Sequence, residues 1–141
     1  MRPHLLTGTL LAASLLLAAG ACRRATEPDP LVGTYLATTF QVAPAGQGPI
    51  NVLALGGTLG INVANNLVTA GTLIVPASLN GGTPFSASLA GTVVRTASSV
   101  RFSQPADSFV RDLTFTLSGD TLEALRQTVG GTTYDIILTR Q

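Results

Sequence analysis

Residues 112–118 read DLTFTLS, an uninterrupted alternation of polar and apolar side chains. Successive side chains of a β-strand point to opposite faces, so this period of two predicts a strand with one buried face. The same alternation recurs along the chain, and glycine or asparagine pairs separate the alternating segments. The clearest further examples are residues 58–63, 85–93, 100–102 and 134–139. Eight or nine short antiparallel strands of this kind predict an all-β domain, either a barrel or a sandwich.

Residues 121–129 fit two structures. A helix is indicated by Asp120 as an N-cap and by Glu123 three residues later. A strand is favoured by a three-residue loop at 118–120 and a two-residue turn at 130–131, which together align two sets of side chains across three strands. The apolar set is Leu113, Leu125 and Ile136, and the charged set on the opposite face is Asp112, Arg126 and Asp135. Agreement of both turns on both faces favours the strand.

The N-terminus has the layout of a cleaved export signal. A short basic start is followed by an uncharged apolar run over residues 5–21, which ends in the small residues Ala18–Ala21. Cys22 comes next, and this order resembles the lipobox of bacterial lipoproteins, in which the cysteine carries the lipid. The resemblance implies a signal peptide over residues 1–21, a palmitate-type lipid anchor on Cys22 and attachment to a membrane. Residue 23 is Arg rather than Asp, which favours the outer membrane and a position facing the periplasm.

The rest of the chain divides into a tether and one domain. Residues 22–30 hold the expected lipidated cysteine and a polar, proline-containing tether. Residues 31–141 have the size of a single domain. The only histidine lies in the expected signal peptide, the only cysteine is the one expected to be lipidated, and lysine and tryptophan are absent. This inventory excludes Cys/His zinc sites and His-based catalytic triads, so we expect no enzyme, no metal and no cofactor.

The charge of the expected mature chain is balanced. Of the eight basic residues one, Arg2, lies in the signal peptide, and the remaining seven face seven carboxylates. No net field is therefore expected to attract nucleic acid.

The domain also resembles the small lipocalin-like lipoproteins of bacteria. In lipocalins a Gly-x-Trp motif opens the barrel, and its ring packs against an arginine of the last strand. Gly33 and Tyr35 occupy the places of that motif, and Arg140 that of the arginine. The resemblance implies an eight-stranded up-and-down antiparallel barrel that can hold one small ligand. The segments that carry it are residues 31–35, 115–122 and 134–140.

The interior of the predicted barrel bears on function at its floor and in its cavity. Arg140 shares the apolar phase of its strand, so a buried pair with Glu123 beneath Tyr35 is expected at the barrel floor. If the interior is hollow, the ligand is a small apolar molecule; if side chains fill it, the protein is a structural or interaction protein of the envelope. The size of the cavity separates the two readings, because a ligand pocket reaches about 300 Å³ or more. The sequence identifies neither the ligand nor a protein partner. The expected lining residues are Phe40, Phe85, Phe102 and Phe115.

Overall fold

The structure is a computed structural model that describes residues 29–141. It consists of β-strands with three short 3-10 helices, η1 to η3, in the connections. In chain order the elements are β1 (Gly33–Pro44), β2 (Ile50–Asn51), η1 (Leu53–Leu55), β3 (Thr58–Val63), β4 (Val68–Val75), η2 (Ala77–Leu79), β5 (Phe85–Ser88), β6 (Gly91–Thr96), β7 (Ser99–Ser103), η3 (Phe109–Asp112), β8 (Phe115–Ser118), β9 (Thr121–Val129) and β10 (Thr132–Arg140). No helix within residues 29–141 is long and apolar enough to cross a bilayer.

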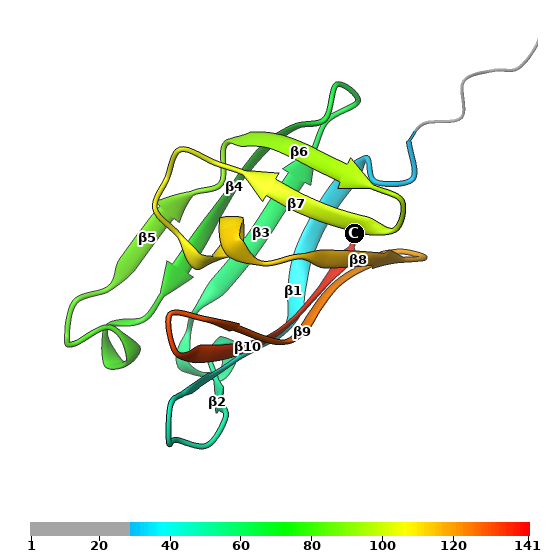
Figure 1. Ribbon diagram of the computed structural model, residues 1–141. Coiled ribbons are helices and arrows are strands. Elements are labelled where there is room, and N and C mark those ends of the chain that lie inside the picture. Colours follow the sequence, from blue (N-terminus) through cyan, green and yellow to red (C-terminus); the bar gives the residue numbers. More distant parts are fainter. Residues whose placement is uncertain (1–28) are drawn as a thin grey trace, which may run out of the picture.

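Eight of the strands form a closed antiparallel barrel in the order β1, β3, β4, β6, β7, β8, β9, β10 (Figure 1). The barrel closes where β10 pairs with β1, from Tyr35 opposite Arg140 to Pro44 opposite Thr132. The other two strands are additions at its edges, because β2 pairs with β1 and β5 pairs with β4. The predicted all-β antiparallel barrel of about eight strands is confirmed, and the sandwich alternative is not the fold.

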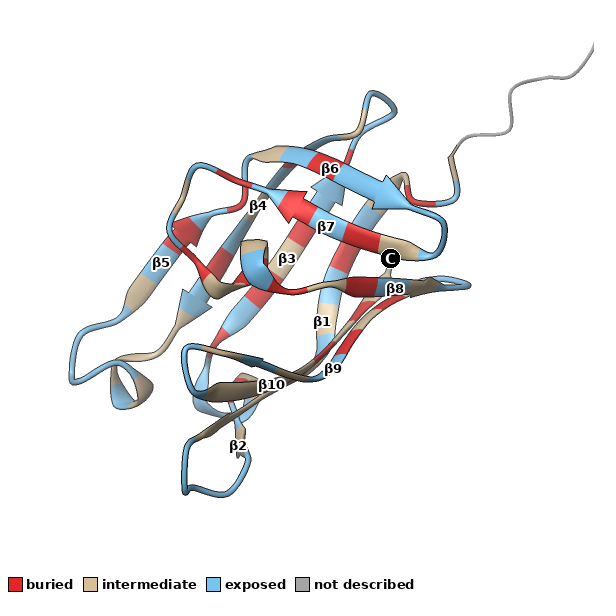
Figure 2. Ribbon diagram, viewed as in Figure 1, coloured by how far each residue is buried: buried red, intermediate tan, exposed pale blue. Residues whose placement is uncertain are grey.

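The alternation seen in the sequence sorts side chains between an interior and an exterior. In β3, Leu59, Ile61 and Val63 are buried, whereas Thr58 and Asn62 are exposed. Figure 2 shows the same banding of buried and exposed residues along other strands of the barrel. The buried apolar side chains form one cluster in the interior, and removing this apolar surface from water is the main stabilising contribution.

Residues 121–129 form strand β9, as the strand interpretation predicted. The turn before it is one residue shorter than predicted, because Ser118 pairs with Thr121 and leaves only Gly119 and Asp120 between them. Gly119 has a φ of 57°, a left-handed conformation that glycine adopts without a steric cost. Side chains alternate with a period of two, so this one-residue difference moves the side chains of residues 121–125 to the face opposite the predicted one.

The predicted apolar alignment of Leu113, Leu125 and Ile136 is therefore wrong. Leu125 is 44% exposed on the outer face. Ile136 pairs with Ala124, and both are buried. Leu113 is buried but precedes β8 rather than belonging to it.

The predicted charged alignment of Asp112, Arg126 and Asp135 is also wrong. Asp112 lies in η3, where its Oδ1 is 3.8 Å from Nε of Arg111. Arg126 sits in a β-bulge, where the pairing of β9 with β10 shifts by one residue. Its φ is 52°, and its backbone N–H donates to Oδ1 of Asp135 at 2.8 Å. Among residues 29–141, the guanidinium of Arg126 forms no ion pair with either carboxylate.

The barrel has two different ends. At the floor, where β1 begins and β10 ends, the entering chain is held by an ion pair between Asp29 Oδ1 and Arg95 Nη1 at 2.7 Å. At the mouth, the opposite end, lie η2, η3 and the β9–β10 turn (Figure 1).

Candidate functional site

The floor is closed by Arg140, the last residue of β10, which lies over the ring of Tyr35 in β1. The guanidinium carbon is 5.4 Å from the ring centroid, and Nη2 donates to Tyr35 Oη at 2.9 Å and to the carbonyl oxygen of Pro30. Tyr35 is fully buried, and its hydroxyl donates to the same carbonyl at 3.4 Å. These contacts join the first strand, the last strand and the entering chain. The expected contact between Tyr35 and Arg140 is present.

Gly33 makes room for this arrangement. A Cβ atom at position 33 would lie 3.2 Å from Cδ and 3.3 Å from Cγ of Arg140, closer than ordinary van der Waals contact. The φ of Gly33 is 153°, which other residues rarely adopt. A glycine two residues before Tyr35 thus lets the stem of Arg140 cross β1.

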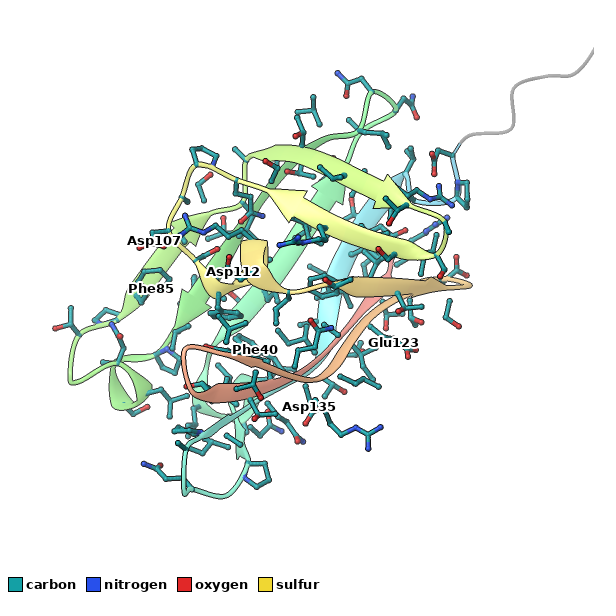
Figure 3. All side chains as sticks on the ribbon, viewed as in Figure 1. Phe40, Phe85, Asp107, Asp112, Glu123 and Asp135 are labelled. Carbon is teal, nitrogen blue, oxygen red and sulfur yellow. The ribbon has the colours of Figure 1, made fainter. Side chains whose placement is uncertain are left out.

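Glu123 is not part of the floor, and its expected pair with Arg140 is wrong. Glu123 pairs opposite Ile137 in the barrel wall and lies on the outer face, where its Oε1 accepts from Thr121 Oγ1 at 3.0 Å. Figure 3 shows it beside β9, on the outside of the barrel. The physical reason is the two-residue turn before β9, which turns Glu123 outward.

Asp120 is the carboxylate that faces Arg140. The distance from Asp120 Oδ1 to Arg140 Nε is 3.6 Å, and the Asp120 side chain is 75% exposed. An ion pair with one partner so exposed contributes only about 0 to 1 kcal/mol. The hydrogen bonds of Arg140 to Tyr35 and Pro30 therefore carry most of the interaction at the floor.

Burial raises the pKa of the Tyr35 hydroxyl above its usual value of 10.0, and the charge and hydrogen bond of Arg140 counteract part of this rise. The pKa of Tyr134 is raised as well, with burial as the main cause. The two tyrosines lie at opposite ends of the barrel, Tyr35 under the arginine and Tyr134 beside the mouth.

Phe102 and Phe115 fill the middle of the barrel. Their rings pack edge to face with centroids 5.3 Å apart, and the two side chains are 1% and 0% exposed. Neither ring lines the cavity at the mouth. The expectation that they line the cavity at the mouth is therefore wrong, because each ring packs against the other.

The mouth holds a cavity of about 460 Å³. Two of the four phenylalanines expected in the lining are there, Phe40 from β1 and Phe85 from β5 (Figure 3). The side chains around it are mainly apolar and come from the barrel wall, from η2 and η3, and from the β9–β10 turn. The lining residues are Phe40, Val42, Pro44, Val52, Val75, Leu79, Asn80, Phe85, Asp107, Ser108, Phe109, Asp112, Val129, Gly130, Thr132 and Tyr134.

The sequence patterns did not predict two further aromatic rings in the lining, Phe109 and Tyr134. Phe109 stacks on Tyr134 with centroids 4.4 Å apart and an interplanar angle of 18°, and it meets Phe40 at 5.9 Å. Tyr134 shares the inward phase of β10, a signal that was present in the sequence. Phe109 lies in η3, outside any alternating segment, so no periodicity marked it.

The polar groups at the mouth are few. Ser108 Oγ is hydrogen-bonded to Gln104 Oε1 at 3.3 Å, and Asp107 and Asp112 lie at the rim of the cavity. Within residues 29–141, no three acidic, histidine or cysteine side chains come together as a metal site. The geometry is that of an apolar cavity with a polar edge, which suits binding of a molecule by burial of its apolar surface.

Comparison of the chain with family models, with curated proteins and with solved structures finds no match. Cys22 and the expected signal peptide lie outside the described residues.

Proposed function

We propose that this protein is a lipocalin-like lipoprotein of the bacterial envelope that binds a small apolar molecule at the mouth of its barrel. The observation that carries the proposal is the cavity of about 460 Å³, which four aromatic rings border. Ligand pockets measure about 300 to 1,000 Å³ and are lined mainly by apolar and aromatic side chains with a few polar groups. The mouth has this size and this composition.

The aromatic rings favour a flat or ring-containing ligand. Phe109 and Tyr134 already stack face to face, and Phe40 is tilted by 42° against Phe109. Offset-stacked and edge-to-face contacts of this kind contribute about 0.5 to 1.5 kcal/mol beyond the burial of surface. A small neutral aromatic or alicyclic molecule would extend the stack.

The lipid anchor is consistent with the direction of the mouth. Asp29 enters at the floor, and only residues 23–28 separate it from Cys22. A lipid on Cys22 would hold the floor near the membrane and leave the mouth directed away from it, accessible to molecules in the periplasm. More than one acyl chain is needed for stable anchoring.

Metabolic labelling with a fatty acid tests the anchor. The wild-type chain is expected to take up label, and Cys22→Ser is expected to abolish it completely, because the sulfur that accepts the lipid is gone. A Ser14→Ala variant in the apolar run serves as the control and should keep the label. Label on Cys22→Ser, or none on the wild type, would contradict the lipoprotein assignment.

The alternative function is a structural or interaction protein of the envelope. The packing of Phe102 against Phe115 supports it, because the middle of the barrel has no room for a ligand. On that reading the mouth cavity is only a surface hollow.

Photolabelling separates the two functions. The full-length chain in its membrane is exposed to a neutral aryl trifluoromethyl diazirine, and the labelled residues are located by mass spectrometry of tryptic peptides. Binding at the mouth predicts label on Phe109 and Tyr134 and none on the buried Phe115. Val129→Trp, which places a large ring in the cavity, should abolish this labelling. Leu125→Trp is the matched control on the outer face of the same strand and should leave it unchanged.

Equal labelling of exposed apolar residues such as Leu125 would reject a specific site. Undiminished labelling in Val129→Trp would reject it as well. Either result would leave the structural or interaction protein as the better account.

A further inference from the structure

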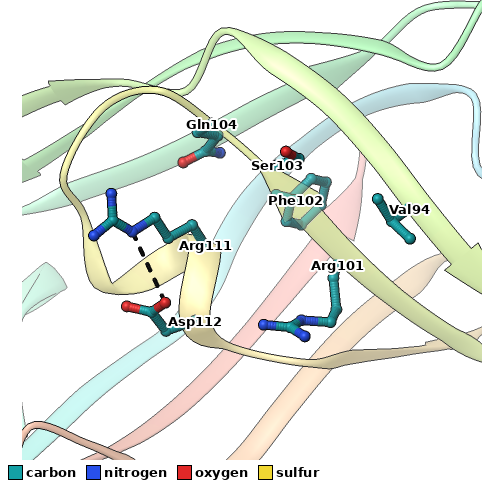
Figure 4. A pocket seen from close by; sticks show the side chains of 7 residues that line it. All are labelled: Val94, Arg101, Phe102, Ser103, Gln104, Arg111 and Asp112. Carbon is teal, nitrogen blue, oxygen red and sulfur yellow. Dashed lines mark ion pairs between the residues drawn. The ribbon is translucent and has the colours of Figure 1, made fainter.

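A second hollow lies in the outer wall of the barrel, where the ladder between β7 and β8 stops. β8 pairs with β7 only at Ser99 and Val100. Past this point η3 lies beside β7 in place of a strand, and a hollow of about 320 Å³ remains between them (Figure 4). It is lined by Val94, Arg101, Phe102, Ser103, Gln104, Arg111 and Asp112.

Two guanidinium groups reach this hollow from different elements. Arg101 comes from β7 and Arg111 from η3, as Figure 4 shows. Arg111 Nη2 bonds to Asp107 Oδ1 at 2.6 Å, and its Nε lies 3.8 Å from Asp112 Oδ1. Arg101 forms no ion pair with any carboxylate of residues 29–141. The hollow therefore has one arginine whose charge is not compensated.

The carboxylates near the hollow equal the arginines in number, but both pair with Arg111 and neither with Arg101. The Asp107 side chain is 93% exposed, so its ion pair with Arg111 faces water. An anion could replace Asp107 as the partner of Arg111 at little cost. Asp112 is the one acidic side chain in the lining. Two cations thus face a single lining carboxylate.

Gln104 supplies an independent indication of a ligand. Its side chain lines the hollow and the residue is only 7% exposed. Its Oε1 is hydrogen-bonded to Ser108 Oγ at 3.3 Å, but its Nε2 is buried without a hydrogen-bond partner. A buried donor left unpaired costs about 1 to 3 kcal/mol, so an acceptor within hydrogen-bond distance of Nε2 would recover that loss.

We propose that this hollow is a binding site for a small oxyanion, a carboxylate or phosphate group. Guanidinium groups bind such anions through charge-assisted hydrogen bonds, often two at a time. The free guanidinium of Arg101 provides the charge, Arg111 provides the second cation, and Gln104 Nε2 donates to an oxygen of the anion. The site opens on the outer wall of the barrel and adjoins the apolar cavity at the mouth at Asp112, which lines both.

The test uses the full-length chain in a nonionic detergent, titrated by calorimetry with inorganic phosphate and separately with acetate at constant ionic strength. We expect one saturable site for at least one of the two anions. If only phosphate saturates the site, the site binds phosphate groups. If only acetate does, it binds carboxylates, and if both do, it binds oxyanions in general. Saturation with neither overturns the proposal.

Variants show whether the binding is at this hollow. Arg101→Gln should weaken it by at least about tenfold, the loss expected when a hydrogen bond to a charged group is removed. Arg126→Gln is the matched control, an exposed arginine on β9 that does not line the hollow, and should change the affinity less than twofold. Equal weakening by both variants would mean diffuse attraction and would contradict the site.

The side-chain amide of Gln104 provides a readout that does not depend on affinity. In a nitrogen-15 NMR spectrum its Nε2 protons should shift on saturation, because they gain an acceptor. The side-chain amide of Gln47, exposed in the β1–β2 connection, should not move. Binding without a shift at Gln104 would place the anion elsewhere and overturn the assignment.

Discussion

The floor and the mouth of the barrel each contain a tyrosine, but only at the floor is the space around it filled. Tyr35 is fully buried under Arg140, whose guanidinium also binds the carbonyl oxygen of Pro30. Tyr134 is only partly buried, and the ring that covers it is Phe109, on the short helix η3 rather than on a barrel strand. One end is closed by strands that pair, and the other is covered by connections between strands.

This difference separates stability from binding. The floor combines paired strands, a buried ring and hydrogen bonds across three chain segments, which are features of a region that opens last. The mouth has fewer buried contacts and a cavity, so its side chains can adjust to a ligand at small cost to the fold. Changes at the floor and in the middle should therefore act on stability, and changes at the mouth on binding.

The largest expected effect is in the packed middle. Phe115→Ala removes a fully buried ring from its edge-to-face partner and should lower the free energy of unfolding by about 3 to 5 kcal/mol. Phe109→Ala, at the mouth, should lower it by less than about half as much, because that ring is partly exposed beside a cavity. Denaturant unfolding of both variants measures the difference. Equal losses would mean that the mouth is packed as tightly as the middle.

The next effect is at the floor. Arg140→Met keeps most of the aliphatic stem but removes the donors to Tyr35 and Pro30, and should cost about 1 to 3 kcal/mol. Arg126→Met, on the exposed bulge of β9, should change stability by less than about 0.5 kcal/mol. The same unfolding experiment compares them. A loss at Arg140 as small as that at Arg126 would show that the floor does not hold the barrel closed.

Alkaline pH should weaken the fold through the tyrosines. Burial raises the pKa of Tyr35 and of Tyr134, so the folded state favours their neutral forms. The stability linked to this shift is fully present below the ordinary pKa of about 10 and is lost as the pH rises through the higher pKa of the folded state. Unfolding followed from pH 8 upward, with Tyr35→Phe as the comparison, measures it. The variant should lose less stability above pH 10 than the wild type, and an identical decline in both would contradict the prediction.

The smallest effect is a gain. Arg126 has a φ of 52°, which strains any residue with a Cβ atom, and its side chain is exposed. Arg126→Gly should relieve the strain and so raise the free energy of unfolding by about 0.5 to 1 kcal/mol. The larger backbone entropy that glycine loses on folding opposes part of this gain. The midpoint of chemical unfolding provides the measurement. A lower midpoint would mean that the side chain of Arg126 contributes contacts that outweigh the strain.

The sequence predicted the barrel and the contact of Arg140 with Tyr35, but not the carboxylate that faces Arg140. Alternation in DLTFTLS and its counterparts predicts strands and an inward Arg140, and the resemblance to lipocalins implies its contact with Tyr35. These signals survive small errors in any one turn.

The errors came from single residues. A turn of two residues instead of three, at Gly119 and Asp120, moved Glu123 to the outer face. The bulge at Arg126 shifted the pairing with β10 a second time. Neither the turn length nor the bulge is marked by a hydrophobic period, and each reverses every side chain that follows it.

The lining of the mouth was only half predictable for a different reason. Alternation shows that a phenylalanine points inward, but not whether another ring fills the space before it. Phe102 meets Phe115 of the neighbouring strand, whereas Phe40 and Phe85 face a cavity. That distinction depends on which side chains the neighbouring strand presents and on η3, which carries Phe109 into the mouth.

The most direct test of a barrel that is packed below and hollow at its mouth uses the aromatic rings. The chain has five phenylalanines, two tyrosines and no tryptophan, and all seven of these rings lie within the described residues. Ring-labelled full-length protein is titrated with toluene, a small neutral aromatic probe, and followed by NMR. Saturable shifts are expected at the four mouth rings, Phe40, Phe85, Phe109 and Tyr134, and no shifts at Tyr35, Phe102 and Phe115. Shifts spread over all seven rings, or no saturable shift at the mouth, would contradict the account.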